Sequence, residues 1–278
     1  MQKKWDEDTI TVPPIKWAGG KRWLVSHYPN IFPKKYNTYY EPFLGSGAVF
    51  FYLKPEKSVL SDLNAELIEF YQTLQKSPFA LQRKLMDHQS FHSEEYYDLI
   101  RKSYPKKRVD RSARFLYLNR SCWNGLYRVN KKGEFNVPIG NRTNFQLKTD
   151  DYRLVSNLLQ NAELNISDFE KTINRANRGD FIFVDPPYTV MHNENGFVKY
   201  NQKIFSWGDQ IRLKACLDRA KKRGAKILIT NAAHRSIEQL YSEHFYIKKL
   251  NRLTNLSANS SSRGITEEYI ISSYKIEV

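Results

Sequence analysis

The sequence has few cysteines, scattered histidines and no long apolar run. Only two cysteines, Cys122 and Cys216, occur in 278 residues, which argues against a disulfide framework and against a Cys-x-x-Cys metal site. The six histidines give no cluster on which to build a metal site, and we expect no metal. No stretch approaches the roughly 18–20 apolar residues of a membrane span. We therefore expect a reducing compartment and no membrane partner.

Acidic residues are also scarce relative to basic ones. Lys and Arg total 44 against 29 Asp and Glu, which gives a formal net charge of +15. Such a surplus favours a polyanionic partner, and nucleic acid is the first choice. The first ten residues carry no apolar core after their lysines, so we expect no signal peptide and a cytoplasmic protein.

The chain does contain the pattern of an α/β protein with a core of its own. Hydrophobic residues make up 41% and aromatic residues 14% of the sequence. After an initial loop, strands are predicted over 38–43, 57–62, 162–168, 181–185 and 226–230. Helices are predicted over 48–53, 64–76, 206–224 and 234–244. Asn64 opens the second of these, and a capping box from Ser206 to Asp209 opens the third. A closing antiparallel pair is predicted over 245–250 and 266–274. This alternation predicts a mostly parallel sheet covered by helices.

The middle of the chain has a different character. Residues 78–151 read as short helices rich in Lys, Arg and Tyr, followed by a β-hairpin over 122–140 around the turn Asn-Lys-Lys-Gly. We therefore predict that 1–77 and 152–278 build the sheet domain and that 78–151 is an inserted domain.

A glycine turn follows the first predicted strand, in the run EPFLGSGAVFF from Glu41 to Phe51. Gly45 and Gly47 permit a tight turn and the close approach of a ligand to backbone amides, although an ordinary strand-to-helix turn can contain the same glycines. The third glycine of a dinucleotide fingerprint is absent, and neither a P-loop nor a nucleophile elbow is present. Asp62, at the end of the next strand, can accept hydrogen bonds from ribose hydroxyls or cap the following helix. Together these residues predict an adenosine-containing cofactor bound without phosphate recognition.

The run PPIKWAGGKR, from Pro13 to Arg22, precedes the first strand. Trp17 can contact a cationic or aromatic group of a ligand, and Lys21 can contact a carboxylate or phosphate. The alternative is a surface turn in which Trp17 fills the edge of the core.

The run RGDFIFVDPPYTV brings an acid to the end of a buried strand. The Asp185 carboxylate and the Pro186 carbonyl can both accept hydrogen bonds from an NH₂ group, and proline fixes the backbone of that carbonyl. Tyr188 offers a flat face for stacking. These residues predict a clamp on a planar ring with an exocyclic amine, whose nitrogen lone pair is left available for attack. A proline-rich turn after a strand is the structural alternative.

The ordered set KWAGGK, EPFLGSG, SDLNAEL, NGLYR, GEFNVPIG and VDPPY resembles the Dam-type, alpha-group DNA adenine-N6 methyltransferases, from about Pro14 to Tyr274. The resemblance implies the Rossmann-like fold of methyltransferases that use S-adenosyl-L-methionine (SAM), with 78–151 as a helical and hairpin DNA-recognition domain. It implies methyl transfer to a flipped adenine in double-stranded DNA, with S-adenosyl-L-homocysteine as the second product and no metal.

The resemblance also assigns residues to roles. The catalytic set is Asp185, Pro186, Pro187 and Tyr188. The cofactor set is Trp17, Lys21, Phe43, Gly45, Gly47, Asp62 and Asp185. The DNA-binding set is Lys16, Trp123, Asn124, Leu126, Arg128 and Pro138. Arg128 matches an arginine that reads a guanine, so GATC or a related GA-containing site is expected. Trp123 stands where close relatives carry a different intercalating aromatic residue.

Three other functions compete with this interpretation. The chain could methylate structured RNA, although the A-form major groove is too narrow for a hairpin to read. It could be a DNA-binding regulator without catalysis, although the intact Asp185 and glycine turn argue against that. An N4-cytosine enzyme would more usually carry Ser in place of Asp185. We expect a monomer from a bacterium or a phage, with or without a cognate restriction endonuclease that acts separately.

Overall fold

The computed structural model describes residues 11–130, 133–191, 205–253 and 265–276 of the chain. Lys131 and Lys132 of the expected hairpin turn lie outside the described residues. The chain divides into two compact units, and each takes segments from several parts of the sequence. Unit 1 comprises Met1–Ser26, Leu44–Glu56 and Asp62–Ile166, and unit 2 comprises His27–Phe43, Lys57–Ser61 and Ser167–Val278.

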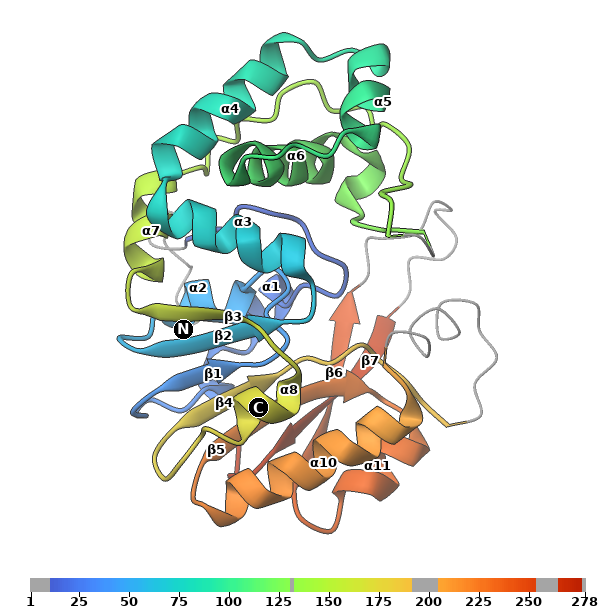
Figure 1. The fold of residues 1–278 in the computed structure, drawn as a ribbon. Coiled ribbons are helices and arrows are strands. Elements are labelled where there is room, and N and C mark those ends of the chain that lie inside the picture. Colours follow the sequence, from blue (N-terminus) through green and yellow to red (C-terminus); the bar gives the residue numbers. More distant parts are fainter. Residues whose placement is uncertain (1–10, 131–132, 192–204, 254–264, 277–278) are drawn as a thin grey trace. The chain divides into compact units, whose positions relative to one another are not determined.

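The strands form a seven-stranded sheet in the order β3-β2-β1-β4-β5-β7-β6 (Figure 1). They are β1 (Tyr39–Glu41), β2 (Ser58–Asp62), β3 (Ala162–Ile166), β4 (Phe181–Val184), β5 (Lys226–Ala232), β6 (Tyr246–Leu253) and β7 (Ile265–Ser272). β1 pairs in parallel with β2 and β4, and β4 pairs in parallel with β5. β7 runs antiparallel between β5 and β6. The mostly parallel α/β fold expected from the sequence is confirmed.

The strand order reverses direction at β1. From there the chain proceeds to β2 and β3 on one side, and to β4 and β5 on the other. Open α/β sheets bind their ligands beyond the carboxyl ends of the strands at such a reversal. Phe43 follows β1 and Asp185 follows β4, so both leave from the carboxyl ends of adjacent parallel strands.

Unit 2 buries one face of its strands under helices. Ile182, Val184, Ile227, Ile229 and Ile271 share a hydrophobic cluster with residues of α10 (Trp207–Lys222), including Leu213 and Leu217. α8 (Phe169–Ile173) and α11 (Arg235–Tyr241) belong to the same unit (Figure 1). α10 begins at the expected capping box, because the Ser206 hydroxyl accepts a hydrogen bond from the Asp209 N–H at 3.1 Å and the Asp209 carboxylate accepts one from the Ser206 N–H at 2.9 Å.

Unit 1 is mainly helical. Its helices include α2 (Ala48–Leu53), α3 (Ala65–Lys76), α4 (Pro78–Ser90), α5 (Glu94–Lys102), α6 (Arg108–Ser121) and α7 (Tyr152–Leu159). α6 packs against α3, α4 and α5, and its residues from Ser112 to Ser121 are all buried. The buried Arg120 guanidinium lies 2.5 Å from the Asp150 carboxylate and also donates to the Pro14 carbonyl at 2.7 Å. This ion pair ties the start of the described chain to the centre of the helical unit.

Two features before β1 were expected as loop, and that expectation was wrong. The structure forms the helix α1 (Arg22–His27) and a short 3₁₀ helix, η2 (Pro29–Ile31). α1 buries Leu24 and Val25. Tertiary burial of these two side chains stabilises a six-residue helix that is too short to be stable by itself.

The expected hairpin is present as a reversal of the chain, but not as a regular two-stranded ladder. The segment contains the 3₁₀ helix η3 (Trp123–Gly125). Among its described residues there are two isolated antiparallel bridges, Cys122 with Ile139 and Val129 with Phe135. Asn124 and Gly125 adopt left-handed conformations, with φ of 55° and 66°, which are incompatible with a strand. Pro138 has no N–H with which to extend a ladder. We call residues 122–140 the recognition segment.

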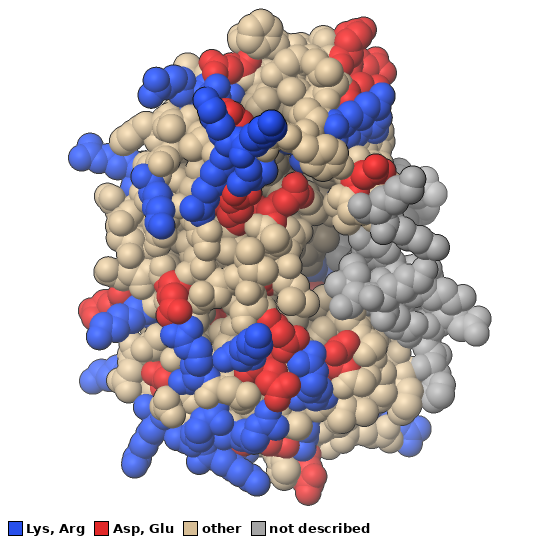
Figure 2. All heavy atoms as spheres, viewed as in Figure 1, with Lys and Arg blue, Asp and Glu red and all other residues tan. Residues whose placement is uncertain are grey.

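Basic residues are spread over the protein rather than gathered in one place on the face that Figure 2 shows, where Asp and Glu lie among them. Some of these cations are ion-paired: Arg212 lies 2.8 Å from Asp168, 3.2 Å from Glu170 and 3.0 Å from Asp209. Within the ranges described above, no helix combines the length and apolar character that crossing a bilayer requires.

Candidate active site and recognition segment

Asp185 is positioned by the end of β4. The four residues of β4 are buried, so the strand holds the following residue at a fixed place on the edge of the sheet. The Thr230 hydroxyl of β5 donates a hydrogen bond to Asp185 Oδ1 at 2.6 Å. Thr230 is fully buried, and its hydrogen bond fixes the rotation of the carboxylate. Pro186 is buried and Pro187 is half-buried, so the backbone that follows is also constrained.

Tyr188 is held by a buried acid, Glu268. Its hydroxyl donates a hydrogen bond to Glu268 Oε2 at 2.6 Å, and Glu268 is only 3% exposed. Burial, together with the nearby carboxylates of Asp185 and Glu268, raises the pKa of Tyr188 far above its usual value. The phenol therefore stays protonated and acts as a donor. The structure thus brings the predicted residues Asp185 and Tyr188 together in unit 2, each with a buried partner.

The glycine turn and Asp62 are joined within unit 1. The Gly45 N–H donates to Asp62 Oδ2 at 3.1 Å, and the Asn64 N–H donates to Asp62 Oδ1 at 3.0 Å. Burial raises the pKa of Asp62, and these backbone hydrogen bonds oppose the rise. The helix-capping alternative for Asp62 does not hold, because Asn64 caps α3 by accepting a hydrogen bond from the Leu67 N–H at 3.0 Å. Asp62 instead braces the glycine turn.

The turn itself needs glycine at both predicted positions. Gly45 and Gly47 have φ of +47° and +65°, in the left-handed region that favours glycine. A Cβ on Gly45 would lie 2.8 Å from Trp17 Cδ1, so the indole rests directly on the backbone of the turn. Trp17 also stacks on Tyr127, with ring centroids 5.4 Å apart and an interplanar angle of 20°. The predicted residues Trp17, Gly45 and Asp62 therefore form one cluster.

Lys21 and Phe43 have contacts of another kind. Lys21 is 3% exposed, and its ammonium donates to the Gly19 carbonyl at 2.8 Å. Phe43 belongs to unit 2, where its ring stacks on Phe169 at 5.5 Å and meets Phe205 edge-on at 5.7 Å. Phe43 thus packs against the hydrophobic core of that unit.

The recognition segment places most of its predicted residues at the surface. Trp123 is 51% exposed, which is unusual for so large an apolar ring. Its N–H donates to the Pro138 carbonyl at 2.9 Å, so two predicted residues are paired through the backbone. The exposed Arg128 donates from Nε to Asn136 Oδ1 at 3.0 Å, which orients the guanidinium. Leu126 is half-buried and Asn124 is exposed.

Lys16 joins the start of the described chain to the same segment. Its backbone N–H and carbonyl are both bonded to the Asn119 side chain, at 3.0 and 2.8 Å. A Cβ on Gly125 would lie 2.6 Å from Lys16 Cδ, so the lysine stem crosses the segment at a glycine. Partial desolvation of its ammonium group, and then the positive charges of Arg142 and Arg22, lower the pKa of Lys16. These neighbouring cations form a local positive surface beside the recognition segment.

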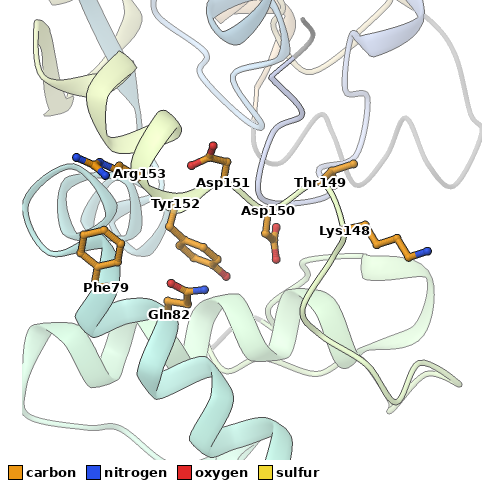
Figure 3. Close-up of a pocket in the computed structure, with 8 residues that line it drawn as sticks. All are labelled: Phe79, Gln82, Lys148, Thr149, Asp150, Asp151, Tyr152 and Arg153. Carbon is orange, nitrogen blue, oxygen red and sulfur yellow. The ribbon is translucent and has the colours of Figure 1, made fainter. Parts of the chain in front are cut away.

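A shallow cavity of about 370 Å³ lies elsewhere in unit 1. Figure 3 shows its lining, which consists of Phe79, Gln82, Lys148, Thr149, Asp150, Asp151, Tyr152 and Arg153. None of these residues belongs to the predicted sets. Asp150 is already paired with Arg120, and Asp151 caps α7 by accepting a hydrogen bond from the Leu154 N–H at 2.7 Å. The cavity is therefore bordered by residues with structural roles.

One histidine pair escaped the sequence interpretation. His88 lies in the last turn of α4 and His92 just after that helix, four residues further on, a spacing that occurs in metal sites. Each ring is instead bonded to a tyrosine hydroxyl at 2.8 Å, His88 to Tyr96 and His92 to Tyr117. Burial lowers the pKa of His88 to about 4, so its ring is neutral at physiological pH. The described residues contain no group of three or more potential metal ligands.

Sequence reasoning missed Thr230, Glu268 and Tyr127, which hold the predicted residues in place. Tyr127 belongs to the motif NGLYR, from which only DNA-contacting residues were predicted. Its hydroxyl donates to the Glu66 carboxylate. Glu268 follows another acid in a β-prone run, and nothing in the sequence separates a buried acid from an exposed neighbour there. The assembled sheet brings Thr230 and Glu268 into contact with the residues they hold.

Comparison with known proteins points to the same family as the sequence motifs. A family model described as D12 class N6 adenine-specific DNA methyltransferase matches residues 17–256. A type II methyltransferase of Lactococcus lactis subsp. cremoris is 39% identical over 271 residues, which cover 94% of this chain and 95% of that protein. A type II methyltransferase of Methanocaldococcus jannaschii is 34% identical over 283 residues, with 93% and 98% covered. A DNA adenine methylase of Haemophilus influenzae is 31% identical over 267 residues, with 93% and 92% covered.

Proposed function

Because the chain belongs to the D12 class of N6-adenine-specific DNA methyltransferases, we propose that it methylates adenine at one short site in double-stranded DNA. The observation that carries the proposal is the pair of residues Asp185 and Tyr188 at the end of β4, each bonded to a buried partner. GATC or a related GA-containing sequence is the proposed site. We propose a monomer, and a cognate endonuclease would act separately.

The residues around the glycine turn fit the cofactor that this family uses. When bound, SAM supplies a methyl group that its sulfonium already activates. Each Asp62 oxygen accepts one backbone N–H, and a carboxylate oxygen has a second acceptor site, which suits ribose hydroxyls. Gly45 and Gly47 give the turn its left-handed backbone, and Trp17 places an aromatic ring directly against it. Lys21 is proposed to contact the carboxylate of the cofactor, and Phe43 to support the turn from the preceding strand.

The clamp at the end of β4 is proposed to hold the adenine. The base must leave the duplex first, because its amine is otherwise inside the stack, and this costs about a few kcal/mol. The Asp185 carboxylate and the Pro186 carbonyl then accept the two amine hydrogens, and Tyr188 stacks on the ring. As the amine nitrogen bonds to the methyl carbon and the carbon–sulfur bond of the sulfonium breaks, the nitrogen would gain positive charge. The Asp185 carboxylate would stabilise that charge until one amine proton is released to solvent. Pro187 keeps the backbone of the clamp rigid.

The target-recognition domain is proposed to be 78–151, with the recognition segment in the major groove. Arg128 would donate to O6 and N7 of a guanine, the geometry that suits a guanidinium. The exposed ring of Trp123 would enter the stack beside the displaced base, with Asn124 next to it. Leu126 and Pro138 would make apolar contacts to bases. Lys16 would contact a phosphate, and the neighbouring positive charges favour that partner.

Methylation mapping by single-molecule sequencing tests the proposal. Unmethylated duplex DNA is incubated with SAM and either the wild-type protein or Asp185→Ala. N6-methyladenine at one short motif, absent with Asp185→Ala although SAM still binds, is the expected result. Methylation of structured RNA in preference to duplex DNA in a competition assay would overturn it, as would equal activity of the two proteins.

A further inference from the structure

A buried ion pair joins β6 and β7 of unit 2 and is bonded to Tyr188 of the proposed clamp. Arg252 of β6 donates from Nη1 to Glu268 Oε1 of β7 at 3.0 Å, and Glu268 Oε2 accepts the hydroxyl proton of Tyr188 at 2.6 Å. The Glu268 side chain is 4% exposed and that of Arg252 is 20% exposed. Burial of such a pair is costly unless its hydrogen bonds are well made, so it invites an explanation beyond stability.

The register of the sheet explains why these groups meet. Val184 pairs with Ile229, so Asp185 and Thr230 come next on their strands and share one face of the sheet. Thr230 pairs with Ile270, and Glu268, two residues away on β7, points to that same face. Four adjacent strands, β4, β5, β7 and β6, therefore present Asp185, Thr230, Glu268 and Arg252 on one face. The opposite face carries the isoleucines of the hydrophobic cluster.

Arg252 determines how Glu268 can pair with Tyr188. Its guanidinium donates to one oxygen of the Glu268 carboxylate, which leaves the other oxygen to accept a hydrogen bond. The Tyr188 hydroxyl must then donate to it, and the hydroxyl has its proton to give. A short hydrogen bond from the hydroxyl to a carboxylate anchored on a strand fixes both the position and the tilt of the ring. Tyr188 lies in a loop, where nothing in the secondary structure would fix its side chain in this way.

We propose that Glu268, held by Arg252, is a positioning residue that fixes the ring of Tyr188 for stacking on the target adenine. Thr230 does the same for the Asp185 carboxylate from the next strand. This inference rests on the proposed function of the clamp. It assigns the antiparallel strand pair β6 and β7 a role in orienting the groups that hold the base, in addition to closing the sheet.

The test is a double-mutant cycle with Tyr188→Phe, Glu268→Ala and the double variant, measured as kcat and as KM for SAM. Removal of a hydrogen bond to a charged group predicts a fall in kcat of roughly 10- to 100-fold for each single variant, with little change in KM for SAM. The double variant should be no slower than the slower single variant, because both lose the same interaction. Glu268→Gln keeps an acceptor and should restore part of the activity lost in Glu268→Ala.

Glu267 provides a matched control on the same strand. It faces the other way and makes a surface ion pair with Lys249 at 3.1 Å, also across β6 and β7. Glu267→Ala should change kcat less than about twofold, since exposed ion pairs contribute little. Should Glu268→Ala fail to fold, Glu268→Gln and Tyr188→Phe complete the cycle in its place. Additive losses, or a Glu268 variant as active as the Glu267 control, would overturn the inference while Asp185→Ala still supports the proposed function. A wild-type protein that does not methylate DNA would overturn both.

Discussion

The side chains of the proposed clamp are held by buried partners, whereas those of the recognition segment are exposed. The clamp residues Asp185 and Tyr188 each bond to a buried side chain on a neighbouring strand, at 2.6 Å in both cases. In the recognition segment, Trp123 and Arg128 are exposed. The reversal that carries them is held by hydrogen bonds to its backbone, such as those from the Asn136 N–H to the Arg128 carbonyl at 3.2 Å and from the Tyr97 hydroxyl to the Val137 carbonyl at 2.8 Å. One region is fixed before any substrate arrives, and the other keeps its side chains available to a partner.

The difference follows from what each region must bind. Methyl transfer tolerates little misplacement of the reacting amine, so groups that hold the amine gain from rigid neighbours. A segment that contacts bases in a DNA groove must reach base edges whose positions vary with DNA shape. Exposed side chains on an irregular backbone can adapt to these positions. The two regions should therefore respond differently to the same kind of substitution.

The largest expected difference is between two aromatic deletions. Tyr188→Ala should lower the free energy of unfolding by about 3 kcal/mol, because it removes a packed ring and leaves the Glu268 carboxylate without one of its donors. Trp123→Ala should change it by less than about 0.5 kcal/mol, since the ring is already half in solvent. Urea denaturation of both variants measures this. Equal destabilisation would show that the two regions are held alike.

The next prediction concerns Arg128 in the recognition segment. Arg128→Ala should lower the preference for one guanine by about 1–3 kcal/mol, because a bidentate contact to the base is lost. Affinity for SAM should not change. Arg153→Ala, an exposed arginine in the same unit, is the control and should leave sequence preference intact. If Arg128→Ala abolished SAM binding instead, the placement of the recognition segment in the major groove would be wrong.

Alanine substitutions at two glycines with positive φ, Gly45 and Gly133, should have the same backbone cost but different effects on SAM binding. Gly45→Ala should weaken SAM binding roughly tenfold, because the left-handed conformation costs about 1–2 kcal/mol and the new Cβ displaces Trp17. Gly133→Ala, at φ +80° with open space around it, carries the same backbone cost in the recognition segment. It should leave SAM affinity unchanged. Calorimetric titration with SAM of both variants gives the answer, and equal losses would contradict it.

The smallest effect is expected at Lys16. Lys16→Met should reduce the dependence of log Kd for DNA on log salt concentration by about one unit, the contribution of a single phosphate contact. The lysine has a lowered pKa in the free protein, and a phosphate nearby favours its charged form. DNA binding should therefore take up a proton, and affinity should fall as pH rises through that lowered pKa. Lys16→Met should lose this fall, which fluorescence anisotropy across alkaline pH would measure.

Local signals in the sequence were enough for most of the architecture. The capping box at Ser206, the cap at Asn64 and the glycine turn each involve residues within a few positions of one another, and all were found. The helix α1 was missed because its stability comes from burial of Leu24 and Val25 rather than from a capping signal. The recognition segment was expected as a regular hairpin, and the left-handed Asn124 was not foreseen.

The same limit applies to the site. Asp185 and Tyr188 belong to one continuous motif and could be chosen from the sequence. Their partners lie 45 and 80 residues away, at Thr230 and Glu268. Whether Glu267 or Glu268 points inward depends on the register of β7 between two strands, and a shift by one residue would exchange them. Contacts of that kind are visible only once the sheet is assembled.

The thiol next to Trp123 has a chemical consequence of its own. Burial raises the pKa of Cys122 to about 12, so at pH 7 the thiol keeps its proton and little of the thiolate that peroxides and alkylating agents attack is present. The other cysteine, Cys216, is also buried, and its pKa is raised to about 11. We therefore expect the backbone of the side chains proposed to contact DNA to resist oxidants. The DNA sequence preference of the protein should then stay the same when the redox state of its surroundings changes.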